Sequence, residues 1–144
     1  MLIGEYTHSF DEKNRISLPA KFRSEVGKKI VITRGLDACL FLYSGKAFEK
    51  FSAKLEDLSM GSAESRGFSR FLFGGAADVE VDSAGRILIP DFLRTFAKID
   101  TSAVFVGVQE RVEIWNKEAW ATYKAKIEQQ GDTLAQKLGD IGFI

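Results

Sequence analysis

The chain contains one short motif twice, and this repeat constrains its fold more than any other feature. The stretch FDEKNRISLPAKFR at residues 10–23 returns as VDSAGRILIPDFLR at residues 81–94. Apolar character is kept at Phe10/Val81, Leu18/Ile89 and Phe22/Leu93. Identical residues occupy Asp11/Asp82, Arg15/Arg86, Ile16/Ile87, Pro19/Pro90 and Arg23/Arg94. A fixed offset shared by so many positions indicates an internal duplication.

The similarity continues beyond the motif after one extra residue in the second copy. Apolar or aromatic residues match at Leu42/Ile114 and Tyr43/Trp115, and alanine matches at Ala47/Ala119. The apolar positions that follow are Phe48, Phe51 and Leu55 in the first copy and Trp120, Tyr123 and Ile127 in the second. Two similar halves therefore cover nearly the whole chain.

Each half begins with a pattern typical of a β-hairpin. The segments 6–10 and 79–81 alternate apolar and polar residues, as a half-buried strand does. Asn14 and Gly85 occupy equivalent places in the turn that follows, and these residue types best tolerate a positive φ. We therefore predict tight turns with a left-handed residue at Asn14 and Gly85, followed by return strands over 15–18 and 86–89.

The rest of each half predicts a short helix, two strands and a longer helix. Pro19 and Pro90 suit the first position of helices over 20–26 and 91–97, because the N–H that proline lacks would be unpaired there. The strand pairs are KKIVITR with CLFLY and SAVFVGV with RVEIW. Ser44 and Asn116 are good N-cap residues for the longer helices.

One more helix, over 63–73, is predicted to join the halves, with Ser62 as its cap and Gly74 and Gly75 at its end. We expect a first half at 1–58, a linking helix at 59–76, a second half at 77–130 and a tail at 131–144. Periodicity leaves the tail open between a last helical turn and disorder.

The repeated unit cannot bury its apolar face alone, since it has only short strands and helices. We therefore predict an internally duplicated α+β fold in which the two halves interleave around a pseudo-twofold axis. No apolar run approaches the roughly 20 residues that cross a membrane, which favours a location in the cytoplasm.

The formal net charge is zero, which argues against a protein that grips polyanions over its whole surface. The segment from Phe10 to Arg34 is nevertheless locally basic, with three acidic residues: Asp11, Glu12 and Glu25. Its basic residues are Lys13, Arg15, Lys21, Arg23, Lys28, Lys29 and Arg34. On charge alone, this pattern also fits an ordinary solvated surface with ion pairs.

The paired motifs DEKNR and DSAGR, followed by SLPAKFR and LIPDFLR, resemble those of the MraZ family. These proteins are bacterial transcriptional regulators of the division and cell-wall gene cluster. The resemblance implies an AbrB-like swapped-hairpin β-barrel with flanking helices and a homo-oligomeric ring of eight or more subunits. It also implies a nucleoid-associated protein that binds short tandem repeats of double-stranded DNA in its own promoter.

The resemblance further implies that the first motif supplies the DNA contacts, with Arg15 foremost. Lys13 and Lys21 in the first motif and Arg86 in the second are further candidates. Ala84 stands where the first copy has Lys13, so the second copy is expected to contribute less.

Arginine can donate two parallel hydrogen bonds to guanine or hold a phosphate, and a two-stranded ribbon fits the major groove. Asp11 and Asp82 would mainly position these arginines, because carboxylates repel phosphate. The alternative is that each Asp and Arg form an ion pair that locks its turn and binds nothing.

Two other functional classes receive less support from the sequence. Asp11 and Asp82 could form an aspartic-protease dyad, but neither is followed by the hydroxyl residue and glycine that such a dyad needs. One histidine, His8, and one cysteine, Cys39, cannot build the usual zinc or nucleophilic sites.

We therefore expect no enzyme activity, catalytic residue, metal or cofactor. His8 is expected at a strand edge or the surface, and Cys39 in the core. A structural ring or protein-interaction scaffold with weak DNA binding remains the alternative function.

Overall fold

A computed structural model describes residues 1–142 and contains one large antiparallel sheet with a second, very small one. The strands of the large sheet follow the order β1-β7-β8-β4-β3-β5. Their bounds are β1 Leu2–Ser9, β3 Lys29–Arg34, β4 Leu40–Ser44, β5 Ala77–Glu80, β7 Ser102–Gln109 and β8 Arg111–Trp115. The small sheet pairs β2, Ile16–Ser17, with β6, Arg86–Ile87. The expected α+β class is confirmed.

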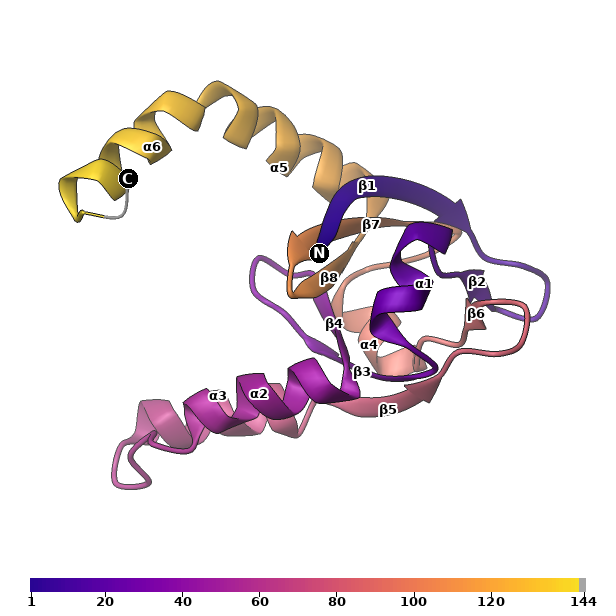
Figure 1. The fold of residues 1–144 in the computed structure, drawn as a ribbon, viewed down its shortest axis with the longest axis horizontal. Helices are drawn as coiled ribbons and strands as arrows, with labels where there is room; N and C mark the ends of the chain where they lie inside the picture. The colour runs from indigo at the N-terminus through magenta and orange to yellow at the C-terminus, as the bar shows by residue number, and fades with distance from the viewer. Residues whose placement is uncertain (143–144) are drawn as a thin grey trace.

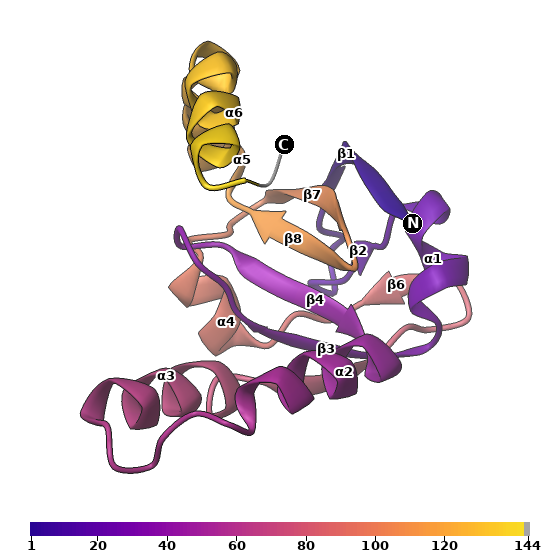
Figure 2. The ribbon, with the colours of Figure 1, turned by 60° about the vertical axis from the view of Figure 1, so that its left-hand side comes forward.

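The helices comprise two short ones beside the sheets and two longer pairs that project as arms. Their bounds are α1 Ala20–Val26, α2 Gly45–Leu55, α3 Ala63–Phe73, α4 Asp91–Phe96, α5 Lys117–Gln129 and α6 Gly131–Asp140. Figure 1 shows the α2/α3 arm and the α5/α6 arm on one side of the sheet, with β2 and β6 at the opposite end. Figure 2 shows the same two arms, well separated, after rotation of the molecule.

The order of the strands shows that the internal duplication gives a pseudo-symmetric fold. The equivalent strands of the two halves are β1 and β5, β3 and β7, and β4 and β8. When each strand is replaced by its equivalent from the other half, the same strand order is obtained in reverse. The small sheet consists of the equivalent strands β2 and β6. The pseudo-twofold axis therefore passes between β4 and β8 and between β2 and β6. The predicted interleaving of the halves is confirmed.

The interleaving changes two of the expected strand arrangements. The predicted hairpins are only partial, because β1 pairs along its length with β7 and β2 pairs with β6. A single bridge, Phe10 to Ile16, closes the first turn. The closed barrel is also wrong for this chain: β1 and β5 are the two edges of the large sheet. Closing the sheet would require hydrogen bonds between the edge strands, and β5 spans only Ala77–Glu80, so it offers few backbone N–H and C=O groups for them.

The helix boundaries follow their caps. Ser44, Ser62 and Asn116 each accept a hydrogen bond from a backbone N–H in the first turn of their helix, as predicted. Pro19 and Pro90 lie one residue earlier than predicted, at the N-cap. Their ψ angles of 132° and 142° are extended, so each helix begins at the following residue.

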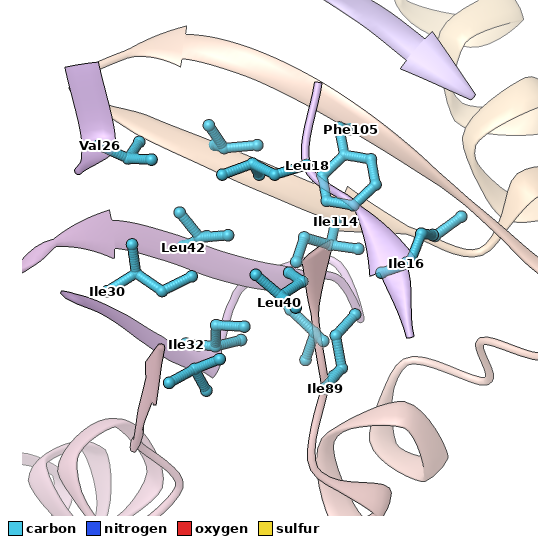
Figure 3. Close-up of a cluster of buried hydrophobic side chains, with 14 of the residues drawn as sticks. Ile16, Leu18, Val26, Ile30, Ile32, Leu40, Leu42, Ile89, Phe105 and Ile114 are labelled. Carbon is cyan, nitrogen blue, oxygen red and sulfur yellow. The ribbon is translucent and has the colours of Figure 1, made fainter. Parts of the chain in front are cut away.

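The main core lies where the halves meet, and both halves fill it with equivalent residues. Ile16 and Ile87 pair across the small sheet, and each is 1% exposed. Figure 3 shows Ile16, Leu18 and Ile89 gathered with Phe105 and Ile114. A second cluster covers the other face of the sheet, where aromatic residues of α2 and α5 pack on Tyr43 and Trp115. Neither half has a core of its own.

The end of the described chain is helical. The tail expected at 131–144 forms α6, whose residues are all exposed, and residues 143 and 144 lie outside the described part. No helix within residues 1–142 is long and apolar enough to cross a membrane.

Candidate nucleic-acid interface

The first signature turn, residues 10–15, is held by backbone hydrogen bonds and one carboxylate. The N–H of Asp11 donates to the carbonyl of Arg15 at 2.7 Å, and the N–H of Asn14 donates to the carbonyl of Asp11 at 3.0 Å. Oδ1 of Asp11 accepts from the N–H groups of Lys13 and Arg15, both at 2.9 Å. Asn14 has a φ of 60°, so the predicted left-handed residue is present.

The second signature turn, residues 81–86, repeats this geometry. The N–H of Asp82 donates to the carbonyl of Arg86, and the N–H of Gly85 donates to the carbonyl of Asp82, both at 2.9 Å. Oδ1 of Asp82 accepts from the N–H groups of Ala84 and Arg86 at 2.9 and 2.8 Å. Gly85 has a φ of 79°. The repeated motif therefore encodes two copies of one turn.

Each signature turn carries an arginine that is paired with its own aspartate. Nε of Arg15 donates to Oδ2 of Asp11 at 3.0 Å, and Nε of Arg86 donates to Oδ2 of Asp82 at 2.9 Å. Within residues 1–142, Nη1 and Nη2 of both arginines donate no hydrogen bond. The side chains of Arg15 and Arg86 are 30% and 34% exposed. Each ion pair thus fixes its guanidinium at Nε and leaves Nη1 and Nη2 without a hydrogen bond among residues 1–142.

The two carboxylates behave as turn anchors. Hydrogen bonds from the backbone of Arg15 lower the pKa of Asp11, with smaller contributions from the Lys13 backbone and the Arg15 side chain. The backbone of Arg86 likewise lowers the pKa of Asp82. A protease dyad that shares one proton would raise one of the two pKa values. Each carboxylate is also bound within its own turn by two backbone N–H groups and one arginine Nε, which does not match the arrangement of an aspartic-protease dyad.

The two signature turns lie next to each other at the end of the molecule opposite the arms (Figure 1). Nη1 of Arg86 is 4.0 Å from Oδ2 of Asp11, which links the turns directly. The N–H of Leu18 donates to the carbonyl of Gly85 at 2.9 Å, and Ser17 pairs with Arg86 in the small sheet. We call the surface formed by residues 10–15 and 81–86 the double-turn face.

The lysine candidates differ in their place relative to this face. Lys13 is exposed within the first turn, and its counterpart Ala84 is exposed but uncharged. Lys21 is exposed on α1, outside residues 10–15 and 81–86. The structure therefore brings Lys13, Arg15 and Arg86 onto one face and leaves Lys21 outside the turns.

Sequence reasoning did not assign a role to the second pair of repeated arginines, Arg23 and Arg94. The guanidinium of Arg94 lies over the ring of Phe10, with Cζ 3.9 Å from the ring centroid. Arg23 lies against the second turn, where a Cβ on Gly85 would be only 2.3 Å from its Cζ. Each arginine therefore contacts the signature turn of the other half. Their identity in both copies of the motif was the available signal.

The histidine and the cysteine lie in positions where they contribute to the fold. His8 lies on the edge strand β1, and its Nδ1 is 2.6 Å from the carbonyl oxygen of Ser17. Cys39 is fully buried, and burial raises the pKa of its thiol. No group of three or more His, Cys, Asp and Glu side chains that could hold a metal ion occurs in the part of the chain that the structure describes.

Comparison with known proteins places the whole chain in one family. The profile of the family described as "MraZ protein, putative antitoxin-like" matches residues 1–71 and again residues 72–138. A protein named "Transcriptional regulator MraZ" from a Thermoanaerobacter species is 45% identical over 98% of this chain and 99% of its own.

Proteins of the same name show similar values in other bacteria. The one from Caldanaerobacter subterraneus is 46% identical over 96% of both chains, and the one from Moorella thermoacetica is 45% identical over 97% of this chain and 98% of its own. The double family match agrees with the two equivalent turns and the pseudo-twofold order of the strands. The chain belongs to the MraZ family.

Proposed function

We propose that this protein is a sequence-specific, DNA-binding transcriptional regulator that reads double-stranded promoter DNA with its double-turn face. The observation that carries the proposal is the pair of matching arginines, Arg15 and Arg86. Each is held at Nε by its aspartate, and among residues 1–142 neither donates a hydrogen bond from Nη1 or Nη2. Similarity over nearly the full length of proteins named as transcriptional regulators supports it. The division and cell-wall gene cluster is the proposed target, and the cytoplasm, in association with the nucleoid, is the proposed location.

The chemistry of the arginines suits base recognition. A guanidinium with two free nitrogens can donate to guanine O6 and N7 in the major groove, and holding it in advance reduces the entropy lost on binding. Asp11 would repel a phosphate, so its role here is to orient Arg15. Lys13 adds a phosphate contact to the first turn that Ala84 cannot add to the second. Arg15 is therefore the principal reader, Arg86 the lesser one, and Lys21 a peripheral phosphate contact.

Assembly supplies the affinity that one double-turn face lacks. The chain has no net charge, so nonspecific attraction to DNA contributes little. We propose that the interleaved halves are a swapped-hairpin arrangement of the AbrB type and that eight or more subunits form a ring. Linked readers on tandem repeats can then raise the affinity roughly 100-fold or more above that of one site.

DNA fragments with one repeat, with several repeats in register, and with the same repeats separated by about half a helical turn test this proposal. We expect strong binding only to the in-register fragment, since half a turn moves the next repeat to the opposite side of the duplex. Equal affinity for the three fragments would contradict joint reading by the ring. Equal affinity for an unrelated fragment would contradict sequence-specific binding.

A structural ring or protein-interaction scaffold is the second candidate function. The α5/α6 arm supports it, because Leu134, Leu138 and Ile141 are 42%, 44% and 67% exposed at helical spacing. A stable oligomer that fails to shift any promoter fragment would favour this alternative.

A further inference from the structure

Arg23 connects the first half of the chain to the second signature turn. It lies on α1, at the position equivalent to Arg94 on α4, and it is half-buried. Its Nε donates to the carbonyl of Leu18 at 2.7 Å, while the N–H of Leu18 donates to the carbonyl of Gly85 at 2.9 Å. Leu18 is thus bonded on one side to Arg23 and on the other to the second turn.

The guanidinium of Arg23 also occupies the space beside Gly85. A Cβ at residue 85 would lie 2.3 Å from Cζ and 2.4 Å from Nε of Arg23. Real Cβ atoms do not approach other heavy atoms so closely. The guanidinium can therefore occupy this space only because residue 85 is a glycine. Moving Arg23 away would break its hydrogen bond to Leu18. Residue 85 is therefore constrained by its positive φ and by Arg23 together.

The contacts continue from Gly85 to the reading arginine. Gly85 donates its N–H to the carbonyl of Asp82, and the carboxylate of Asp82 accepts from the backbone and Nε of Arg86. A continuous series of direct contacts therefore runs from Arg23 through Gly85 and Asp82 to Arg86.

The first turn is supported differently, which makes it an internal comparison. Asn14, the counterpart of Gly85, has a Cβ, and Arg94 stacks on Phe10. An Nη of Arg94 donates to the carbonyl of Asp100 at 2.5 Å. Within residues 1–142, no hydrogen bond joins Ile89 to Asn14 as Leu18 is joined to Gly85.

We propose that Arg23 is a positioning residue for DNA recognition by the second signature turn, and that it acts through Gly85 and Asp82 on the orientation of Arg86. This inference rests on the proposed function, because it assigns Arg86 a contact with promoter DNA. It adds that the first half controls the second reader. The effect of Arg23 on binding therefore depends on the presence of Arg86.

A double-mutant cycle with Arg23→Ala, Arg86→Ala and the combined variant tests this dependence on a fragment from directly upstream of the gene. We expect Arg23→Ala to weaken binding about 3- to 5-fold, no more than Arg86→Ala does, and to add less than about 2-fold in the Arg86→Ala background. Arg23→Lys should restore part of the loss, because its ammonium can still donate to Leu18.

Three results would overturn the inference. One is wild-type affinity for Arg23→Ala, and another is wild-type affinity for Arg86→Ala. The third is a full additive loss in the double variant with a smaller salt dependence, which would show that Arg23 binds phosphate itself.

Hydrogen exchange of the DNA-free protein separates this inference from the proposed function. Arg23→Ala should speed exchange in residues 82–88 and leave the first turn, residues 11–15, unchanged, whereas the control Arg94→Ala should affect the first turn. If the wild-type protein shifts no promoter fragment, the proposed function fails and the role in recognition fails with it. If the wild-type protein binds but Arg23→Ala leaves exchange at residues 82–88 unchanged, the inference alone fails.

Discussion

The two signature turns share one backbone design and differ in what surrounds it. Both have an aspartate that accepts two backbone N–H groups and one arginine Nε, and both have a left-handed residue. The first turn carries Lys13 and tolerates a side chain at Asn14, whereas the second has Ala84 and a glycine pressed against Arg23. The two turns thus share their backbone scaffold and their arginine, and they differ at Lys13 and Ala84 and in the surroundings of Asn14 and Gly85.

Substitutions of equivalent core residues in the two halves should have the largest effect on stability. We expect Ile16→Ala and Ile87→Ala to lower the free energy of unfolding by similar amounts, about 2 to 5 kcal/mol each, because both side chains are 1% exposed and pair with each other. Urea unfolding measures both losses. The control Leu88→Ala, at a site that is 57% exposed, should change stability by less than about 0.5 kcal/mol. A large loss for one isoleucine alone would show that the halves are unequal in the core as well.

Substitutions at the left-handed residues, Asn14 and Gly85, should change the stability of the two turns by different but smaller amounts. Gly85→Val places a β-branched residue at a φ of 79° and against Arg23, so we expect a loss of about 1 to 3 kcal/mol. Asn14→Gly should cost less than about 1 kcal/mol, since glycine adopts the same φ without strain. Thermal unfolding of both variants decides the matter, and a Gly85→Val protein as stable as the wild type would refute the described turn.

Acid should change the stability of the two turns in the same direction. The pKa values of Asp11 and Asp82 are lowered in the folded protein, chiefly by backbone N–H groups. Their contribution to stability is therefore complete above the unfolded pKa of about 4 and is lost as the pH falls through the lower folded value.

Stability measured between pH 6 and pH 2.5 should accordingly fall less steeply in Asp11→Asn and in Asp82→Asn than in the wild type. Unchanged slopes in both variants would mean that neither carboxylate anchors its turn.

Much of this fold could be predicted from the repeat and local chemistry. Asn14 and Gly85 marked the turns, Ser44 and Asn116 marked helix starts, and the shared motif required the halves to interleave. The strand partners could not be assigned in this way, because pairing between β1 and β7 depends on contacts between distant segments. For the same reason the alternating pattern predicts fuller hairpins than the structure contains. The closed barrel is implied by the family resemblance, and the open edges β1 and β5 contradict it.

The candidate site was predictable to the extent that it lies within the motif. The spacing of Asp11 and Arg15 indicated the ion pair, and the structure shows that Arg15 pairs through Nε and donates no hydrogen bond from its other two nitrogens among residues 1–142. The place of Arg23 beside Gly85 could not be predicted, since it requires the two halves to be docked.

The most direct measurement is the affinity of Arg15→Ala for a fragment of the promoter, compared with Arg86→Ala and with Lys54→Ala, a control on the α2 arm. We expect Arg15→Ala to lose about 1 to 3 kcal/mol of binding free energy, Arg86→Ala to lose less, and Lys54→Ala to bind as the wild type does. Circular dichroism and the oligomer size should be unchanged in all three. Wild-type affinity in a folded Arg15→Ala protein would contradict the assignment of the double-turn face as the DNA-reading surface.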